Sequence, residues 1–287
     1  MNLEELTRQA VQAALEAGEL IRSYRDREVE VLHKEGGDTY ASQVVTEVDR
    51  KAQDAILQVL ESSCEEFGLA ILTEENEDDG SRFEKQCFWC IDPMDGTLPF
   101  IRKEPGYSVS IGLVAKDGSP KIGVVYDPAH KVLWQAAKGQ GVRRNGEPWT
   151  LNPSSRELTF TYDRSFETRP EHDRVLRKLE EYAHSLGLKK LVATQFGGAV
   201  LNACHALESA PGCHFKFAKP QEGGGSLWDY AATACLFEEA GAAVSDVHGQ
   251  PLDLNRSDST FMNHRGAVYA TDENLAQSIR EILAQSE

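Results

Sequence analysis

The hydrophobic positions near the start of the chain recur at helical spacing. Five of them are predicted to share one face of a helix over residues 2–25: Leu3, Leu6, Val11, Leu15 and Ile21. A polar segment containing glycines follows at residues 35–42, and a second helical pattern begins near Asp49. The N-terminal part therefore predicts two helices joined by a loop.

The middle of the chain changes to short apolar runs separated by turns. Strands are predicted at residues 70–72, 87–92, 107–115, 122–126 and 132–136. Asn145 and Gly146 then form the strongest short hairpin pattern in the chain. Successive strands with such turns predict an antiparallel meander.

The second half alternates between helical and strand patterns. Helices are predicted at residues 171–185, 199–208 and 228–240 and after residue 271, with strands near residues 191, 213–217 and 268. With 287 residues, the chain is long enough for one large domain or two lobes.

Charge narrows the range of partners. The chain carries 30 Lys and Arg against 46 Asp and Glu, a formal net charge of -16, which argues against a surface that coats nucleic acid. An anionic substrate would need bound cations that make the local charge of its binding site positive. No apolar run approaches the roughly 18 residues of a membrane helix, and the N-terminal segment does not resemble a signal peptide. The sequence thus predicts a cytoplasmic protein without a membrane partner.

The six cysteines are scattered, which favours reduced thiols over a disulfide framework. Cys87 and Cys90 have the spacing of a redox pair, but residues three apart on a strand point to opposite faces. The histidines show no zinc-type spacing. Neither residue type therefore predicts a metal or redox site.

The most informative stretch is the acidic elbow at residues 92–97, where the predicted strand 87–92 ends. Asp92 and Asp95 lie between Pro93 and Gly96, which restrict and shape the turn. Two carboxylates held on one turn suit a hard divalent cation. Gly96 and Thr97 could open a helix, whose first amides are able to bind an anion. Metal and phosphate would then meet at one point.

Further acids lie where other predicted elements begin or end. Asp49 and Asp229 fall in the first turns of predicted helices, where the ordinary role of an acid is to offset the helix dipole. Glu74 and Glu75 follow a short strand, as Asp92 does, and sites gather at strand ends in mixed α/β sheets. The glycine run at residues 223–225 indicates backbone that passes close to a bulky group.

These motifs together resemble the inositol monophosphatase superfamily, whose members are Mg2+-dependent, lithium-sensitive phosphomonoesterases. The resemblance covers nearly the whole chain and rests on four motifs in the family's order: Thr46-Glu47-Val48-Asp49, Glu74-Glu75, Asp92-Pro93-Met94-Asp95-Gly96-Thr97, and Trp228-Asp229-Tyr230-Ala231-Ala232 followed by Glu239-Ala240-Gly241. It implies a phosphoric monoester hydrolase that acts on a small phosphate ester.

The resemblance also implies a ligand set for two or three Mg2+ ions. Glu74, Asp92 and the carbonyl of Met94 would hold the first ion, and Asp92, Asp95 and Asp229 would hold a second. The loop at residues 34–42 is similar to the family's metal-binding loop, but it looks longer here, and no ligand of a third ion is assigned in it.

The catalytic roles follow from the same resemblance. Thr97 and Asp49 would orient and help to deprotonate a water that Glu74 also contacts. The phosphate would lie against Asp95 and the amides of Gly96 and Thr97.

The implied fold is a layered αβαβα sandwich, with a larger antiparallel sheet and a second, smaller α/β lobe. We expect a single catalytic domain over residues 1–287 with lobes of about 1–150 and 151–287, and the site between them. A homodimer is the family's usual state.

The substrate is left open between branches of the superfamily. Glu222, seven residues before Asp229, falls where inositol phosphatases carry a glutamate that binds ring hydroxyls, although an exposed loop glutamate is an equal explanation. The glycine run and residues 244–252 are similar to 3'(2'),5'-bisphosphate nucleotidases, which convert adenosine 3',5'-bisphosphate to AMP. We therefore predict an inositol monophosphatase-like enzyme, with the nucleotidase as the alternative. A non-catalytic relative that binds metal or phosphate is a second alternative, disfavoured because every catalytic carboxylate position and Thr97 are filled.

Overall fold

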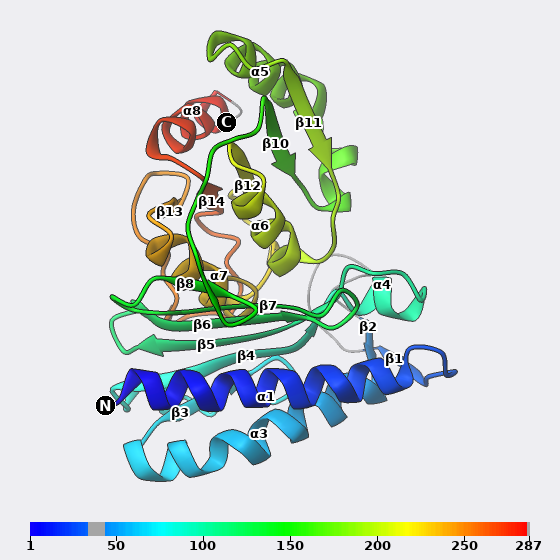
Figure 1. The fold of residues 1–287 in the computed structure, drawn as a ribbon, viewed down its shortest axis with the longest axis vertical. Helices are drawn as coiled ribbons and strands as arrows, with labels where there is room; N and C mark the ends of the chain where they lie inside the picture. The colour runs from blue at the N-terminus through cyan, green and yellow to red at the C-terminus, as the bar shows by residue number, and fades with distance from the viewer. Residues whose placement is uncertain (34–43, 286–287) are drawn as a thin grey trace.

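The computed structural model of the protein describes residues 1–33 and 44–285. Two sheets alternate with three layers of helices (Figure 1), which confirms the predicted αβαβα arrangement. The predicted loop at residues 34–42 lies outside the described residues.

The larger sheet has seven strands in chain order, which confirms the meander. They are β3 (Ala70–Thr73), β4 (Cys87–Asp95), β5 (Ser108–Ala115), β6 (Pro120–Asp127), β7 (Val132–Ala137), β8 (Val142–Arg144) and β9 (Glu147–Trp149). Only the β3–β4 pair is parallel. The hairpin between β8 and β9 turns at Asn145 and Gly146, both with positive φ, as a two-residue Asn-Gly turn requires.

Helices α1 (Leu3–Tyr24) and α3 (Glu47–Phe67) cover one face of this sheet (Figure 1). The predicted face of α1 is wrong at Leu15, which is 38% exposed. The buried face is made mainly of small residues, including Ala10, Ala13, Ala14 and Ala17. Small side chains bring the helix backbone close to β6, so large apolar residues were a poor guide to the buried face.

The opposite face of the sheet is covered by α6 (Ala199–Glu208) and α7 (Leu227–Glu239). Helix α7 lies very close to the strands. A Cβ added to Gly112 of β5 would lie 2.8 Å from the Cβ of Ala231, and one added to Gly123 of β6 would lie 2.2 Å from the carbonyl oxygen of Ala232. The start of α7 is thereby held against strands that belong to the first half of the sequence.

The second sheet has the order β11 (Lys190–Thr194), β10 (Glu157–Thr161), β12 (Gly212–Lys216), β14 (Ala267–Ala270) and β13 (Ala243–Ser245). The first three strands are parallel, and α5 (His172–Ser185) and α8 (Glu273–Ala284) form the outermost layer. Strands β10 and β13 were not predicted. The remaining short elements are β1 (Val31–His33), β2 (Val44–Thr46), α4 (Thr97–Ile101) and the 3-10 turns Ser81–Phe83 and Arg164–Thr168.

All six cysteines are free thiols. Cys87 and Cys90 belong to apolar clusters on opposite sides of the large sheet, as the strand geometry predicts. Within the described residues, every helix is too short or too polar to cross a membrane.

Candidate metal centre and active site

The acidic elbow is an irregular end of β4. The pairing of β4 with β5 shifts between Asp92 and Asp95, and the Asp92 carboxylate accepts a hydrogen bond from the Met94 amide at 2.9 Å. Gly96 has a φ of 87°, and a Cβ there would lie 2.4 Å from the carbonyl oxygen of Gly106. Both conformation and space therefore require glycine where the chain turns into α4.

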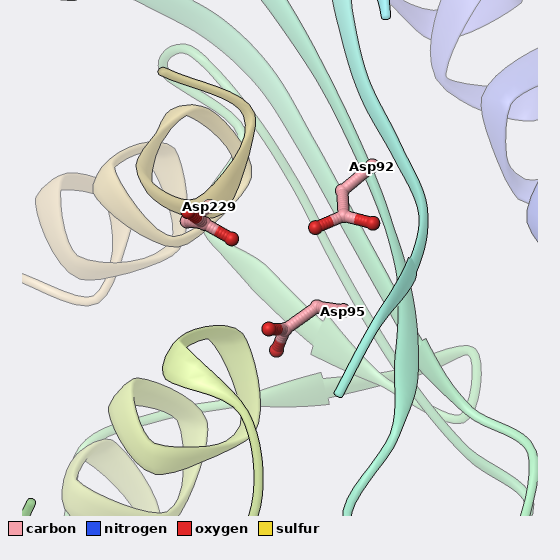
Figure 2. Close-up of side chains that lie close together, drawn as sticks. All are labelled: Asp92, Asp95 and Asp229. Carbon is pink, nitrogen blue, oxygen red and sulfur yellow. The ribbon is translucent and has the colours of Figure 1, made fainter. Parts of the chain in front are cut away.

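Three carboxylates converge beside this turn. Within the described residues, Asp92, Asp95 and Asp229 form the one group of acids or other metal-ligand side chains whose ligand atoms all lie within 4.8 Å of one another. Figure 2 shows the three side chains pointing toward a common space, with Asp229 on α7 and the other two on β4. Asp229 is 134 positions beyond Asp95 in the sequence, so the fold brings distant parts of the chain together here.

Glu74 joins the cluster because β3 runs parallel to β4. Thr73 pairs with Ile91, and the Glu74 amide donates to the Ile91 carbonyl at 3.2 Å, so Glu74, just after β3, lies beside Asp92 of the neighbouring β4. The Glu74 and Asp92 side chains share a hydrogen bond. The shared strand end explains why Glu74 and Asp92 meet.

Asp49 contacts Thr97 at the same end of the large sheet. One carboxylate oxygen of Asp49 accepts from the Thr46 amide at 2.7 Å and the Thr46 hydroxyl at 2.6 Å. The other accepts from the Thr97 hydroxyl at 3.0 Å. Asp49 therefore bonds back to the start of α3 and also contacts the elbow through Thr97.

Asp229 has the same local geometry on α7. Its carboxylate accepts from the amide of Ser226, the residue that precedes the helix, at 2.6 Å. In both helices the acid occupies the third position and one of its oxygens bonds back to the helix start. This bond fixes the rotamer and so fixes where the second oxygen lies.

Burial makes these carboxylates reluctant to ionise. The pKa of Asp95 is raised to about 8, first by burial and then by the charge of Asp229. The pKa of Asp92 is raised well above its usual range by burial and by Glu74, and burial raises the pKa of Asp49 to about 7. Buried, closely spaced oxygen donors that lack enough positive charge fit a hard divalent cation, which would favour their ionised forms.

The start of α6 also contacts the cluster, which the sequence did not predict. The Val200 amide donates to Asp95 at 2.9 Å, and a Cβ on Gly198 would lie 2.2 Å from the same carboxylate. The one sequence pattern that could have indicated this contact is the Gly197-Gly198 pair before the helix predicted at residues 199–208. It has many structural explanations, because glycines often precede helices.

The remaining predicted residues differ in their placement. The Met94 carbonyl lies 3.3 Å from the Thr97 hydroxyl, within the elbow. Glu222 lies on the segment that leads from β12 to α7, and it is exposed rather than packed into the carboxylate cluster. Among the described residues its side chain makes no hydrogen bond or ion pair, although its charge raises the pKa of Arg256 after larger effects from Asp258.

The layered fold and the acidic cluster at its strand ends define a candidate metal-dependent hydrolase. The model of the inositol monophosphatase family matches residues 2–284, and the chain belongs to that family.

Named relatives support membership of this family. The chain is 32% identical over 282 residues to inositol-1-monophosphatase of Synechocystis, covering 96% of this chain and 87% of that one. It is 31% identical over 259 residues to inositol monophosphatase 2 of Homo sapiens, covering 88% and 83%. The solved structure of an inositol monophosphatase from Anabaena (Nostoc) superposes with a TM-score of 0.68 at 25% identity, covering 99% and 97%.

Proposed function

We propose that this protein is a Mg2+-dependent phosphomonoesterase that hydrolyses a small phosphate ester with an activated water. The observation that carries the proposal is the convergence of Asp92, Asp95 and Asp229 within 4.8 Å, beside the Asp49–Thr97 contact. The three carboxylates can hold a cation, and the Asp49–Thr97 pair can accept a proton and pass it on.

In this proposal the acids divide between two ions. Glu74, Asp92 and the Met94 carbonyl would hold one, and Asp92, Asp95 and Asp229 would hold the other. When bound, Mg2+ would supply positive charge that stabilises the phosphoryl oxygens and lowers the pKa of a water.

The protein's own groups orient the reactants. The Thr97 hydroxyl, held by Asp49, positions the attacking water and passes its proton toward the Asp49 carboxylate. The amides of Gly96 and Thr97 face the transferred phosphate beside Asp95.

The decisive experiment measures phosphate release from inositol 1-phosphate with and without Mg2+. We expect activity that is lost in chelator, and a fall in kcat/KM of at least about 100-fold in Asp95→Asn, because removal of a ligand should exceed the loss of an outer contact. Asp54→Asn, an exposed change on α3, is the control. Full activity in excess chelator, or in folded Asp95→Asn, would contradict the metal mechanism, whereas no phosphate release by the folded wild type with Mg2+ would favour a relative that acts only by binding.

For the substrate we propose a polyol phosphate, supported by the named inositol monophosphatases among its relatives. The alternative is a 3'(2'),5'-bisphosphate nucleotide. The measurement is kcat/KM for inositol 1-phosphate against adenosine 3',5'-bisphosphate in the wild type and in Glu222→Ala. We expect Glu222→Ala to lower the inositol-to-nucleotide ratio by about tenfold, since it removes a contact to ring hydroxyls. An unchanged ratio would exclude Glu222 as the specificity residue.

A further inference from the structure

A polar network holds the loop that carries Glu222, and the loop leads into Ser226, whose amide donates to Asp229 at 2.6 Å. The loop, residues 219–225, has no regular structure, and its last three residues, Gly223, Gly224 and Gly225, all have positive φ. Among the described residues the Glu222 side chain has no partner that could fix it. Its position must come from how the backbone on either side is held.

The segment 260–263 holds that backbone at both ends of the loop. The Lys219 amide donates to the Asn263 carbonyl at 2.8 Å. At the far end, the Met262 amide donates to the Gly225 carbonyl at 2.9 Å, and the Leu227 amide donates to the Thr260 carbonyl at 2.9 Å. The two segments lie antiparallel where Ser226 pairs with Phe261.

Asn263 is the side chain that joins this contact to the rest of the network. It is 6% exposed, and its amide nitrogen donates to the carbonyl of Lys219 at 3.1 Å. Its amide oxygen accepts from the Arg256 guanidinium at 3.0 Å. Asn263 therefore transmits the position of Arg256 to the first residue of the loop.

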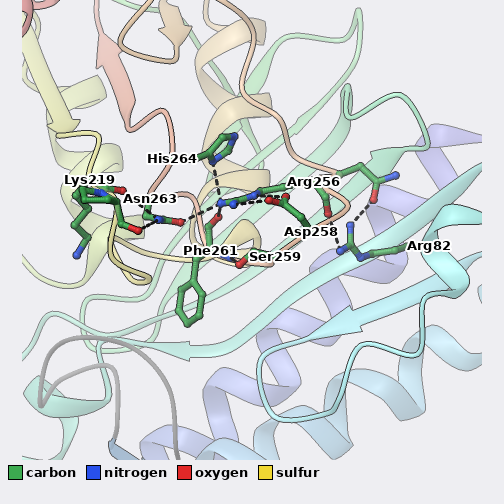
Figure 3. A network of polar contacts seen from close by, with 10 residues as sticks. Arg82, Lys219, Arg256, Asp258, Ser259, Phe261, Asn263 and His264 are labelled. Carbon is green, nitrogen blue, oxygen red and sulfur yellow. Dashed lines mark hydrogen bonds and ion pairs between the residues drawn. The ribbon is translucent and has the colours of Figure 1, made fainter.

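The Arg256 side chain holds the segment 260–263 in place. Its guanidinium also donates to the Phe261 carbonyl at 2.7 Å and to the Nδ1 of His264 at 3.0 Å, and it pairs with both oxygens of Asp258 (Figure 3). Only 12% of the Arg256 side chain is exposed. A planar guanidinium with five N–H groups can hold these acceptors together, and an ammonium group cannot.

The residues just before this segment, Asn255 and Arg256, are bonded to Arg82, which follows the strand end that carries Glu74. Arg82, 2% exposed, pairs with Asp78 and donates to the Asn255 side chain at 2.6 Å and to the Arg256 carbonyl at 2.9 Å. Residues 255–263 therefore connect the polypeptide that follows Glu74 to the loop that carries Glu222.

We propose that Arg256, acting through Asn263, is a positioning residue that places the 219–225 loop and thereby sets the affinity for the alcohol part of the substrate. The inference rests on the proposed phosphatase function and extends it. Phosphoryl transfer depends on the carboxylates and Thr97, whereas recognition of the alcohol depends on the loop.

The test compares two esters in the wild type, Arg256→Leu and Arg256→Lys. The esters are inositol 1-phosphate, whose ring hydroxyls can contact the loop, and p-nitrophenyl phosphate, whose leaving group has none. We expect Arg256→Leu to raise KM for inositol 1-phosphate by about tenfold, with kcat on p-nitrophenyl phosphate within about threefold of the wild type. Arg256→Lys should raise KM for inositol 1-phosphate nearly as much as Arg256→Leu does, because the lysine ammonium cannot reproduce the planar contacts of the guanidinium.

Arg265→Leu is the matched control, since it removes an arginine from the same segment that pairs only loosely, at 3.9 Å, with Asp246. A second readout needs no activity. Glutamyl endopeptidase should cleave after Glu222 several times faster in Arg256→Leu and Asn263→Ala than in Arg265→Leu, as followed by mass spectrometry of the fragments.

The outcomes separate the two proposals. A wild type inactive on both esters with Mg2+ overturns the phosphatase function and this inference with it. An active wild type whose Arg256→Leu variant loses both esters equally, or keeps an unchanged KM and cleavage rate after Glu222, overturns the positioning role alone.

Discussion

At the scale of single residues, a hydrogen bond to the helix start orients two acids of the proposed site, Asp49 and Asp229. Asp49 and Asp229 had an ordinary explanation as first-turn acids, and the structure shows that each does bond back to its helix start. The helix-start bond uses one oxygen and orients the other. Their position in the first helical turn was readable from the local sequence, whereas their proximity to Thr97 and Asp92 was expected only from the family resemblance, because these contacts join distant segments.

The Asp49–Thr97 contact should act as one catalytic unit. We expect Thr97→Val, which removes the hydroxyl at nearly constant volume, to lower kcat by about 10²- to 10³-fold. Asp49→Asn should cause a similar loss, and the double variant should be no slower than the worse single variant, since groups that act together are not additive. The measurement is steady-state kcat at saturating Mg2+.

Thr168→Val, at an exposed position, is the control for the threonine change. Losses that multiply in the double variant would mean that Asp49 and Thr97 act independently. In that case the 3.0 Å contact between them would only stabilise the fold.

At the scale of elements, the sequence predicted most helices and strands because their periodicity is local. Residues 199–208 were predicted as a helix with the observed bounds of α6, and the Asn145-Gly146 hairpin was confirmed. Strand β10 was missed because its five residues alternate too briefly to stand out. The buried face of α1 was partly wrong because alanine packing is decided by the partner surface, which a single helix does not reveal.

The close approach of α7 to the large sheet sets the position of Asp229. In Gly112→Ala, the new Cβ would meet the Cβ of Ala231 at 2.8 Å and backbone atoms at 3.1 Å, so the helix must move away. We expect a loss of about 1–3 kcal/mol in the free energy of unfolding. The concentration of Mg2+ needed for half-maximal activity should also rise, because Asp229 moves with its helix.

The double variant Gly112→Ala/Ala231→Gly serves as the control, because it removes the nearest of the clashing atoms. It should recover part of the stability and part of the Mg2+ affinity. Recovery of stability with no recovery of Mg2+ affinity would show that the position of α7 does not control the metal site.

At the scale of the whole molecule, the acids of the proposed site are held together by contacts between distant parts of the chain. Arg82 and Asn255 are 173 positions apart and form a partly buried hydrogen bond, which no local pattern indicates. Helix α7 comes from the second half of the chain and packs on the sheet of the first half. The ligand motifs were recognisable from their order, whereas the surrounding network depends on tertiary contacts.

The acidic centre should make the stability of the metal-free protein depend on pH. The pKa of Asp49 is raised to about 7 and that of Asp95 to about 8. A raised carboxyl pKa means that the folded state binds more protons than the unfolded state, so stability is lost as pH rises through the folded pKa. Histidines with a lowered pKa, such as His214 at about 4, act in the opposite sense below about pH 6.5. The clearest window is therefore pH 6.5 to about 8.5.

In chelator, the unfolding temperature should fall across that window. A difference of one proton over one pH unit corresponds to about 1.4 kcal/mol, or about 3 °C for a chain of this size. Mg2+ should stabilise the protein more at pH 8 than at pH 6.5, because it binds the ionised carboxylates that are otherwise costly to bury. Asp95→Asn removes one titrating group and should flatten the slope in chelator, while Asp54→Asn should not. A slope of the opposite sign, or stabilisation by Mg2+ that is equal at both pH values, would mean that these carboxylates are already ionised and compensated without a metal.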